Sequence, residues 1–157
     1  MTSLHPSCAA IDALLAAAGV PGRVRLLPDA APTAQAAADQ LGCELGAIAN
    51  SLIFLTADDR PLLIMTSGAH RVDTTRIGEL LGAPIRRAGA DMVRRATGQP
   101  IGGVAPIGHP VPIRTLVDED LRAYDPLWAA GGIPHAVFPI SFEHLVALTG
   151  GEVVGVA

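Results

Sequence analysis

Two apolar runs joined by a short polar turn constrain the fold of this chain more than any other feature. Residues 48–56 and 61–66 are almost entirely apolar, and residues 57–60 (Ala-Asp-Asp-Arg) separate them. Such a pair of runs is typical of an antiparallel β-hairpin. Because apolar residues in these runs do not alternate with polar ones, the pattern predicts that both faces of the hairpin are buried. We therefore expect this hairpin at the centre of a sheet.

Helical and further strand patterns flank the hairpin. Ile11, Leu14 and Leu15 have the spacing of one helix face, and Gly19 follows them as a helix end. Thr33 and Ser141 are typical N-cap residues of two later helices. The predicted helices span 6–18, 34–41, 72–81, 90–97 and 142–148, with a short helix or turn at 118–121. The further predicted strands span 23–27, 83–87, 111–117, 124–130, 133–140 and 152–156.

This order of elements predicts the fold class. Strands outnumber helices, and the helices are inserted between strands, as in proteins whose helices cover a sheet. We expect one α/β (α+β) domain over residues 1–157. Its sheet is expected to be curved, mixed but mostly antiparallel, and barrel-like, with the helices packed outside. Half of the 157 residues are apolar, which is enough to bury a core of ordinary size.

Composition limits the cellular setting and the partners. No apolar run reaches the roughly 18 residues of a membrane span, and no secretory signal precedes the first helix. The two cysteines, Cys8 and Cys43, have no CxxC spacing, which favours free thiols in the cytoplasm. The net charge is −4, and all eleven basic residues are arginines without a basic tract. These features argue against DNA binding and against general nucleic-acid binding, so an RNA partner would be held by a local patch and a pocket.

The stretch from Gly98 to Gly108 is the second constraining feature. It reads Gly-Gln-Pro-Ile-Gly-Gly-Val-Ala-Pro-Ile-Gly and contains four glycines, two prolines and no charge. Glycine and proline at these positions rule out a helix. Two interpretations remain from the stretch alone. It is either a glycine-rich turn between strands or a pocket wall that offers bare backbone N–H groups to a ligand.

Common catalytic arrangements are weakly supported. No GxSxG sequence is present, so a serine hydrolase of that type is not indicated. Ser67, His70 and Asp73 lie close in sequence, but such residues at a strand-to-helix turn usually form local hydrogen bonds. A triad therefore has little support from the sequence.

Metal and thiol chemistry have no better support. His109 and His135 have no companion at ligand spacing, so we expect neither a metal nor a cofactor. Cys43 follows a predicted helix end, where the helix dipole disfavours a thiolate. What remains is a pocket with few chemical groups. Such a pocket favours catalysis by positioning and backbone donors, or binding alone.

Five segments, taken in order, resemble a known family. They are residues 33–42, 48–54, 67–73, 98–108 and 131–135. Together they resemble the YbaK/ProX family of free-standing aminoacyl-tRNA deacylases, related to the editing domain of bacterial prolyl-tRNA synthetases. The resemblance covers most of the chain from Thr33 onward and implies the YbaK-like fold. It also implies hydrolysis of the ester that links a wrong small amino acid to the terminal adenosine of a tRNA, without a protein nucleophile.

The resemblance also implies roles for individual residues. It implies that Gly102, Gly103 and Val104 line the aminoacyl site with backbone N–H groups. By position, it assigns catalytic roles to Gly102, Gly103 and Asn50, and substrate contacts to Ser51, Ser67, Gly68, Arg71, Ile101, Val104 and His135.

Asn50 departs from the family pattern. Many members have lysine at this position, where it is expected to hold the terminal phosphate or ribose. Asparagine donates a hydrogen bond but brings no charge. By sequence position, Arg71 is the nearest basic residue that would replace the missing charge. For His135, a purely structural role on a strand remains an alternative.

Three functional hypotheses follow. The first is a trans-editing deacylase whose partners are the acceptor end of an aminoacyl-tRNA and, as a further candidate, an aminoacyl-tRNA synthetase. The second is a non-catalytic binding protein for a tRNA 3′ end or a small metabolite. The third is a hydrolase of an ester that is not part of tRNA. No hypothesis involves DNA or a membrane.

Overall fold

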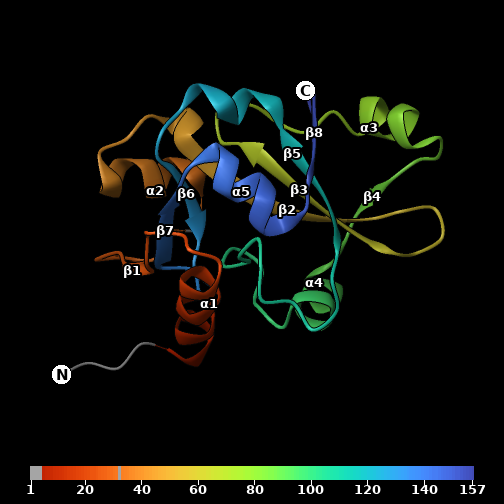
Figure 1. Cartoon of the computed structure of the whole chain (residues 1–157). Helices are drawn as coiled ribbons and strands as arrows, with labels where there is room; N and C mark the ends of the chain where they lie inside the picture. Colours follow the sequence, from red (N-terminus) through yellow and green to blue (C-terminus); the bar gives the residue numbers. More distant parts are fainter. Residues whose placement is uncertain (1–4, 32) are drawn as a thin grey trace.

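One mixed sheet forms the centre of the protein, as a computed structural model that describes residues 5–31 and 33–157 shows (Figure 1). Seven strands follow the order β1-β7-β6-β2-β3-β5-β8, and β4 pairs with β2 beside this path. The strands are β1 (Arg25–Leu26), β2 (Ile48–Leu55), β3 (Pro61–Ser67), β4 (Arg86–Arg87), β5 (Arg114–Asp118), β6 (Leu127–Ala130), β7 (Ala136–Ile140) and β8 (Glu152–Val154).

The predicted hairpin is confirmed at the centre of this sheet. β2 and β3 pair antiparallel from Ala49 opposite Ser67 to Leu55 opposite Pro61. The four consecutive residues 62–65 of β3 are fully buried, and consecutive residues of a strand point to opposite faces. Both faces of the hairpin are therefore buried, as the uninterrupted apolar pattern predicts.

The sheet is mixed, but it is open. Four strand pairs are antiparallel (β1–β7, β2–β3, β2–β4 and β6–β7), and three are parallel (β2–β6, β3–β5 and β5–β8). β1 and β8 lie at the two ends of the strand order, and no pairing between them closes the described part of the chain into a barrel. The predicted mixed, mostly antiparallel sheet is confirmed, and its curvature stops short of closure.

The helices agree closely with the sequence pattern. They are α1 (Pro6–Ala17), α2 (Ala34–Leu41), α3 (Thr74–Leu81), α4 (Ala90–Thr97) and α5 (Phe142–Thr149), with short 3-10 helices η1 (Leu45–Ala47) and η2 (Glu119–Ala123). The Thr33 and Ser141 side chains accept hydrogen bonds from backbone N–H groups of the first turns of α2 and α5, which confirms both caps. α3 begins two residues later than predicted because Asp73 caps it by accepting from the Arg76 N–H.

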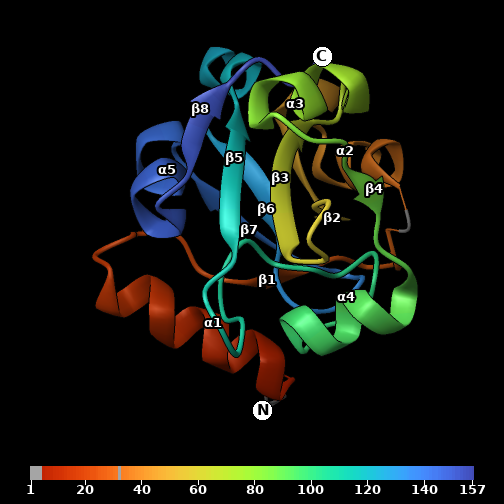
Figure 2. The ribbon, with the colours of Figure 1, turned by 90° about the vertical axis from the view of Figure 1, so that its right-hand side faces the viewer.

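Helices cover both faces of the sheet (Figure 2). α5 lies on one side, where Leu145 and residues of α1 join the largest core cluster. α2 and β4 lie on the other side, where Ala37 and Ala38 of α2 pack near Ile48. Among the described residues, no helix has both the length and the apolar character needed to cross a membrane.

Candidate functional site

β2 has two different strand partners along one edge, and a gap lies between them. Ile48 and Ala49 pair with β6, whereas Phe54 and Leu55 pair with β4. No described strand pairs with residues 50–53 on that edge. Backbone groups that this stretch directs toward the gap, and that bond to no other group, are available to a ligand.

Backbone geometry identifies the groups that face the gap. The Ile53 C=O accepts a hydrogen bond from the Ala88 N–H, 3.1 Å away, on the β4 side. The Ile48 C=O points the opposite way, because it accepts from the Gly68 N–H beside β3. Since backbone direction alternates along a strand, the N–H and C=O of Ser51 point into the gap.

A cavity of about 220 Å³ occupies this gap. Its wall comes from β2, α2, the β6–β7 hairpin and the glycine-rich loop. The lining residues are Ala31, Thr33, Ala34, Ala37, Ile48, Ala49, Asn50, Ser51, Leu52, Ile53, Arg87, Val93, Ile101, Gly102, Val104, Trp128, Ala129, Ala130, Pro134, Ala136 and Val137. Most are small or apolar, and the polar side chains among them belong to Thr33, Asn50, Ser51 and Arg87.

The glycine-rich loop reaches the cavity through a tight turn. The Gly103 N–H donates to the Pro100 C=O at 2.9 Å, which closes a four-residue turn. Gly102, the third residue of the turn, has a φ of +89°, as a type II turn requires. A side chain is disfavoured at this φ, and a Cβ added to Gly102 would meet no other atom within 4 Å. Gly102 thus presents bare backbone to open space beside Ile101 and Val104.

Buried polar side chains hold the rest of this loop. The Gln99 Oε1 accepts from the Ala105 N–H at 2.6 Å, and its Nε2 donates to the Ile107 C=O at 3.3 Å. The Thr97 hydroxyl accepts from the Gln99 N–H at 3.0 Å. Gln99 is 4% exposed, so its amide replaces the backbone hydrogen bonds that a loop without regular structure lacks. Sequence reasoning missed this role, because an isolated glutamine carries no pattern.

The two adjacent glycines have different surroundings. A Cβ on Gly103 would lie 2.6 Å from the Ile133 carbonyl carbon and 2.9 Å from the Pro134 nitrogen. Gly103 is therefore the contact between the glycine-rich loop and the β6–β7 turn, whereas Gly102 faces the cavity. Sequence patterns alone give no means to separate two neighbouring glycines in this way.

Half of the predicted site residues meet at the cavity. Asn50, Ser51, Ile101, Gly102 and Val104 line it.

The other predicted residues lie outside the lining. His135 is half-buried between Pro134 and Ala136, which do line the cavity. Gly68 packs behind the wall, because a Cβ there would lie 3.0 Å from the Ala34 Cβ and 3.3 Å from the Ile48 Cβ.

The arginine at the cavity is not the one that the sequence motif suggests. Arg71 is exposed in the segment before α3 and is absent from the lining. Arg87 of β4 lines the cavity instead, with its guanidinium carbon 5.5 Å from the centroid of the Phe54 ring. Arg87 is exposed on the short strand β4, and the sequence pattern could not place it at the cavity because that place depends on the pairing of β4 with β2 beside the gap.

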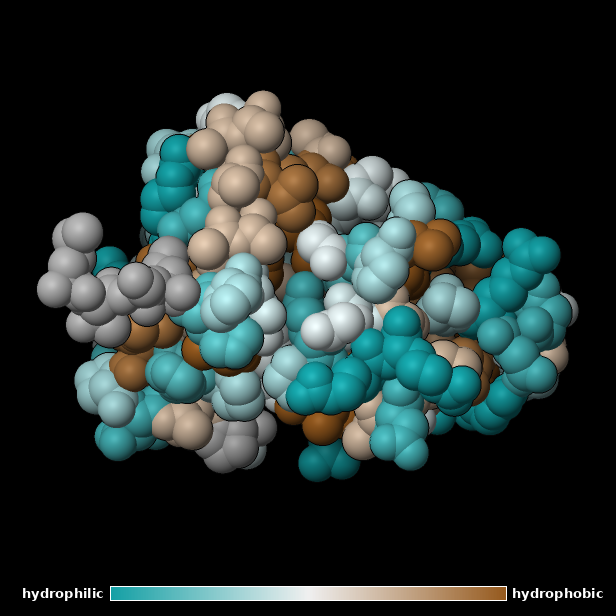
Figure 3. All heavy atoms as spheres, turned by 90° about the horizontal axis from the view of Figure 1, so that it is seen from below, coloured by the Kyte–Doolittle hydropathy of each residue, from teal (hydrophilic) through white to brown (hydrophobic). Residues whose placement is uncertain are grey.

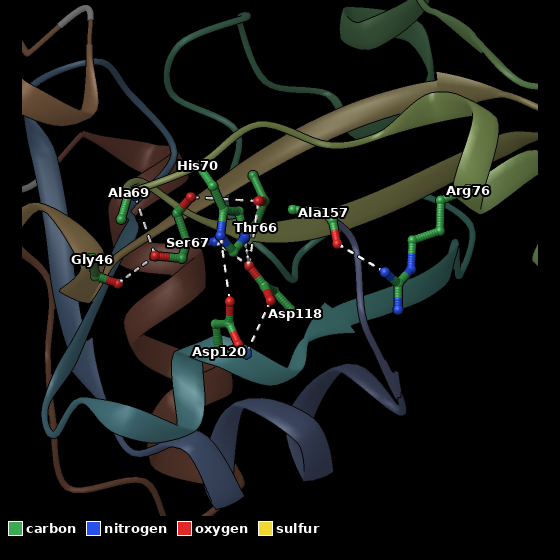
Figure 4. A network of polar contacts seen from close by, with 9 residues as sticks. All are labelled: Gly46, Thr66, Ser67, Ala69, His70, Arg76, Asp118, Asp120 and Ala157. Carbon is green, nitrogen blue, oxygen red and sulfur yellow. Dashed lines mark hydrogen bonds and ion pairs between the residues drawn. The ribbon is translucent and has the colours of Figure 1, made fainter.

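A second polar cluster surrounds the predicted site residue Ser67 (Figure 4). The buried Asp118 carboxylate accepts hydrogen bonds from the Ser67 N–H at 2.9 Å and from the Asp120 N–H at 2.9 Å, and it pairs with His70. The other ring nitrogen of His70 lies 3.4 Å from an Asp120 carboxylate oxygen. The Ser67 hydroxyl donates to the Gly46 C=O at 2.9 Å. The cluster joins the end of β3 to η2.

This cluster settles the triad hypothesis for these residues. The Ser67 hydroxyl is bonded to backbone groups, His70 pairs with Asp118, and Asp73 caps α3. No hydroxyl–imidazole–carboxylate chain forms among them. His70, Asp118 and Asp120 also bring one ligand-type atom each within 4.8 Å of one another, a grouping that their sequence spacing conceals. In this arrangement the polar atoms of the cluster bond to each other.

The thiols have properties that disfavour nucleophilic attack. Burial raises the pKa of Cys43, and the neighbouring Glu44 raises it further against a lowering backbone hydrogen bond. Burial also raises the pKa of Cys8, with an added contribution from Asp12. Both thiols are therefore protonated near neutral pH. Neither lines the cavity.

Comparison with known proteins places this geometry in context. The profile of a family described as "Aminoacyl-tRNA editing domain" matches residues 28–148. The crystal structure of a protein proposed to be a trans-editing enzyme for prolyl tRNA synthetase is 40% identical, with a TM-score of 0.91 and 98% of each chain covered. The crystal structure of hypothetical protein APE2540 is 30% identical, with a TM-score of 0.87, covering 94% of this chain and 98% of that one.

Curated relatives agree with these matches. Uncharacterized protein YwhH of Bacillus subtilis (strain 168) is 27% identical over 113 residues, 72% of each chain. The proline–tRNA ligase of Lactobacillus gasseri is 32% identical over 76 residues, which are 48% of this chain and 13% of the ligase. This chain therefore corresponds to a small part of that much longer protein.

Proposed function

The chain belongs to the family of aminoacyl-tRNA editing domains, and from that premise we propose that it hydrolyses the ester bond of a mischarged aminoacyl-tRNA carrying a small amino acid. The cavity between β4 and β6 is the proposed aminoacyl site. The proposed mechanism uses positioning and backbone donors, with no protein nucleophile, metal or cofactor. A role in translation would place the protein in the cytoplasm.

The size of the cavity supports a small acyl group. Its volume of about 220 Å³ lies below the roughly 300 Å³ at which pockets for drug-sized ligands begin. Several lining residues, such as Ala37, Ala49 and Ala129, have a single methyl group as their side chain. Shape discriminates small side chains poorly during tRNA charging, so small amino acids are those that most need a second check.

The chemistry of the wall supports hydrolysis by positioning. Among the described residues that line the cavity there is no histidine, cysteine or carboxylate. The backbone N–H of Ser51 points into the gap, and the Gly102 backbone faces it without a side chain. Backbone donors aimed at a carbonyl oxygen stabilise the negative charge that develops there during attack.

The proposed reaction is a direct hydrolysis. The oxygen of water attacks the ester carbonyl carbon, and the bond from that carbon to the ribose oxygen breaks. One water proton passes to the leaving ribose oxygen, and the neighbouring ribose hydroxyl of the substrate helps to carry it. The products are a free amino acid and a tRNA with both terminal hydroxyls restored.

The polar side of the cavity suits the terminal nucleotide. Asn50 supplies an amide that donates and accepts hydrogen bonds, and Arg87 supplies a cation at the same wall. A guanidinium binds a phosphate through two parallel hydrogen bonds. Arg87 thus takes the role that the sequence motif suggested for Arg71, and it compensates for the lysine that Asn50 replaces.

The observation that carries the proposal is the unpaired Ser51 backbone in the gap between the β4 and β6 pairings of β2, with Gly102 in the lining of the same cavity. The test is to incubate the protein with Ala-, Ser-, Thr-, Cys- and Pro-tRNA and to follow loss of the ester. Because two relatives are connected with proline charging, mischarged tRNA specific for proline is the first substrate to use. We expect rapid loss of one or two mischarged species. Equal background loss of all species would contradict the proposal.

A second candidate function is binding without hydrolysis. The same absence of acids and bases from the described cavity wall favours it, since no side chain there can move a proton easily. In the same assay, tight binding with every ester intact would support this candidate. No interaction with any aminoacyl-tRNA would instead point to an ester that is not part of tRNA.

A further inference from the structure

Some of the chain's arginine side chains have a partner within the protein and others do not. Eight of the eleven arginines form a hydrogen bond, an ion pair or a ring contact within the protein: Arg23, Arg25, Arg60, Arg76, Arg86, Arg87, Arg114 and Arg122. Among the described residues, the arginines with no such partner are Arg71, Arg94 and Arg95. Two of these three cations are adjacent, on α4.

α4 turns both of these arginines outward. Its inner side is formed by the buried Val93 and Thr97, while Arg94 and Arg95 are exposed. Seen from the end of the molecule that carries α1 and α4, hydrophilic residues gather over α4, whereas the surface over α1 is more apolar (Figure 3). Asp91 lies one turn earlier on the same outer side but forms no ion pair with either arginine.

α4 is also next to the cavity. Val93 belongs to the cavity lining, and Arg94 and Arg95 follow it directly. Because successive residues of an α-helix are separated by about 1.5 Å along its axis, Arg94 and Arg95 start from the same turn of α4 that Val93 joins to the cavity wall. Val93 packs in the core cluster that also contains residues of α1 and α5, and it lines the same cavity as residues of α2; Figure 2 shows α4 below β4, near α1.

The local charge contrasts with that of the chain. Residues 86–95 contain four arginines and one aspartate, in a protein whose net charge is −4. Of these arginines, Arg86 pairs with Asp59 and Arg87 faces the cavity. A positive patch on an otherwise negative surface directs a polyanion to one place and one orientation.

We propose that the outer side of α4 binds phosphates of the tRNA acceptor stem, through Arg94 and Arg95. This inference rests on the proposed function, because it assumes that the RNA 3′ end lies in the cavity. An RNA whose last nucleotide reaches Arg87 continues past the neighbouring helix, where two unpaired guanidiniums face solvent. Guanidinium groups bind phosphates through paired hydrogen bonds and do not depend on base identity.

The first measurement is binding of uncharged tRNA by fluorescence anisotropy between 50 and 200 mM salt. The double variant Arg94→Gln with Arg95→Gln should raise Kd about tenfold at 50 mM salt, since each phosphate contact releases counterions. It should also make the negative slope of log K against log salt shallower by about 1.4–1.8, the value for two contacts. The matched control, Arg76→Gln with Arg122→Gln, removes the same charge around α3 and η2 and should leave Kd within about twofold.

The second measurement compares two esters. For the α4 double variant, the ratio of kcat/KM on full-length mischarged tRNA to that on an aminoacylated CCA trinucleotide should fall about tenfold, because only the longer substrate reaches α4. Thermal unfolding of both double variants checks that each is folded.

The outcomes separate this inference from the proposed function. An unchanged Kd and salt slope in the α4 variant would overturn the inference, as would equal weakening in both double variants. Hydrolysis of the trinucleotide ester with no effect of α4 leaves the deacylase proposal standing without the docking surface. Binding of tRNA that depends on α4, with every ester intact, would overturn the deacylase and retain the surface.

Discussion

The cavity beside β2 and the polar cluster around Asp118 contrast in how their hydrogen-bonding groups are used. In the cluster, Ser67, His70 and Asp118 are bonded to one another or to backbone groups. At the cavity, the Ser51 backbone faces a gap in strand pairing, and the Asn50 side chain has no hydrogen bond among the described residues. The cluster contains the residue types of a catalytic site. The cavity instead contains hydrogen-bonding groups that are free to bind a ligand.

This difference shows which observation identifies a site. Serine, histidine and aspartate within reach of each other suggest chemistry, yet the bonds in the Asp118 cluster tie the end of β3 to neighbouring segments, namely η1 through Gly46 and the junction of β5 and η2 through Asp118. The cavity wall of alanines, glycine and unpaired backbone has few reactive groups. A ligand can nevertheless form hydrogen bonds with the unpaired backbone groups without breaking an existing bond. The comparison therefore assigns a structural role to the cluster and a binding role to the cavity.

Removal of the Asp118 carboxylate is the strongest test of this comparison. Asp118→Ala leaves the Ser67 N–H and the His70 ring without their buried acceptor. We expect the free energy of unfolding to fall by about 3 kcal/mol, measured by urea denaturation. The folded fraction should retain its kcat/KM. Asp120→Ala is the control, because its carboxylate is exposed and should matter by less than about 1 kcal/mol. Lost hydrolysis with unchanged stability would move the cluster into the active site.

Gly102→Ala tests the cavity side of the comparison. The new methyl group would enter open space at the wall, so we expect kcat/KM to fall about 100-fold, or about 2.7 kcal/mol. The positive φ adds a stability cost of about 1 kcal/mol. Gly150→Ala is the matched control, because Gly150 has a φ of +63° and no atom within 4 Å of an added Cβ, yet lies outside the cavity lining. It should lose similar stability and keep full activity. If Gly102→Ala also keeps its activity, the glycine-rich loop is not the site.

Arg87 and Asn50 test whether the charge at the cavity is used. Arg87→Gln should raise KM for mischarged tRNA about tenfold, the effect of about 1.4 kcal/mol from one charged hydrogen bond. Asn50→Lys should lower KM in the wild-type background and recover most of the loss in the Arg87→Gln background. A rate that is unchanged or worse with Asn50→Lys, across all aminoacyl-tRNAs tested, would count against compensation between these positions.

The sequence predicts the elements of the fold well because their signals are local. The apolar runs of the β2–β3 hairpin, the caps at Thr33 and Ser141 and the glycines that end helices act within a few residues. The two-residue strands β1 and β4 are shorter than predicted. Pairing with a partner, rather than local pattern, sets where a strand ends. The openness of the sheet is likewise a property of all its strands together.

The sequence predicts the site only in part, for the same reason. Asn50, Ser51 and Gly102 belong to motifs that adjoin the gap, so their positions could be inferred. The gap itself depends on the pairing of β2 with both β4 and β6, which start more than 30 residues downstream of β2. Arg87 acquires its place only through that pairing. Asp118 meets His70 across 48 positions of sequence, a separation that no motif spans.

One histidine lies in the Asp118 cluster and another lies beside the glycine-rich loop of the cavity. They extend the comparison to the pH dependence of stability, where we expect the smallest effect. His70 contacts two carboxylates in the cluster, whereas His109 bonds only the Ala105 C=O at 2.9 Å, beside the glycine-rich loop. The apolar residues Leu14 and Ile113 line the same surface pocket as His109. Burial lowers the pKa of His109, and the hydrogen bond to Ala105 offsets this only in part.

The sign of the pH effect follows from this lowered pKa. Below about pH 6.5, the ordinary pKa of histidine, the unfolded chain binds a proton at His109 that the folded chain still excludes. The free energy of unfolding should therefore fall as the pH drops from 6.5 toward the folded pKa, and should not depend on His109 above that range. Urea denaturation between pH 7.5 and 5.5 measures this slope. His109→Gln keeps an amide that can donate to Ala105 but does not titrate, so the variant should show a flatter profile. An equally steep profile in the variant would assign the slope to another group.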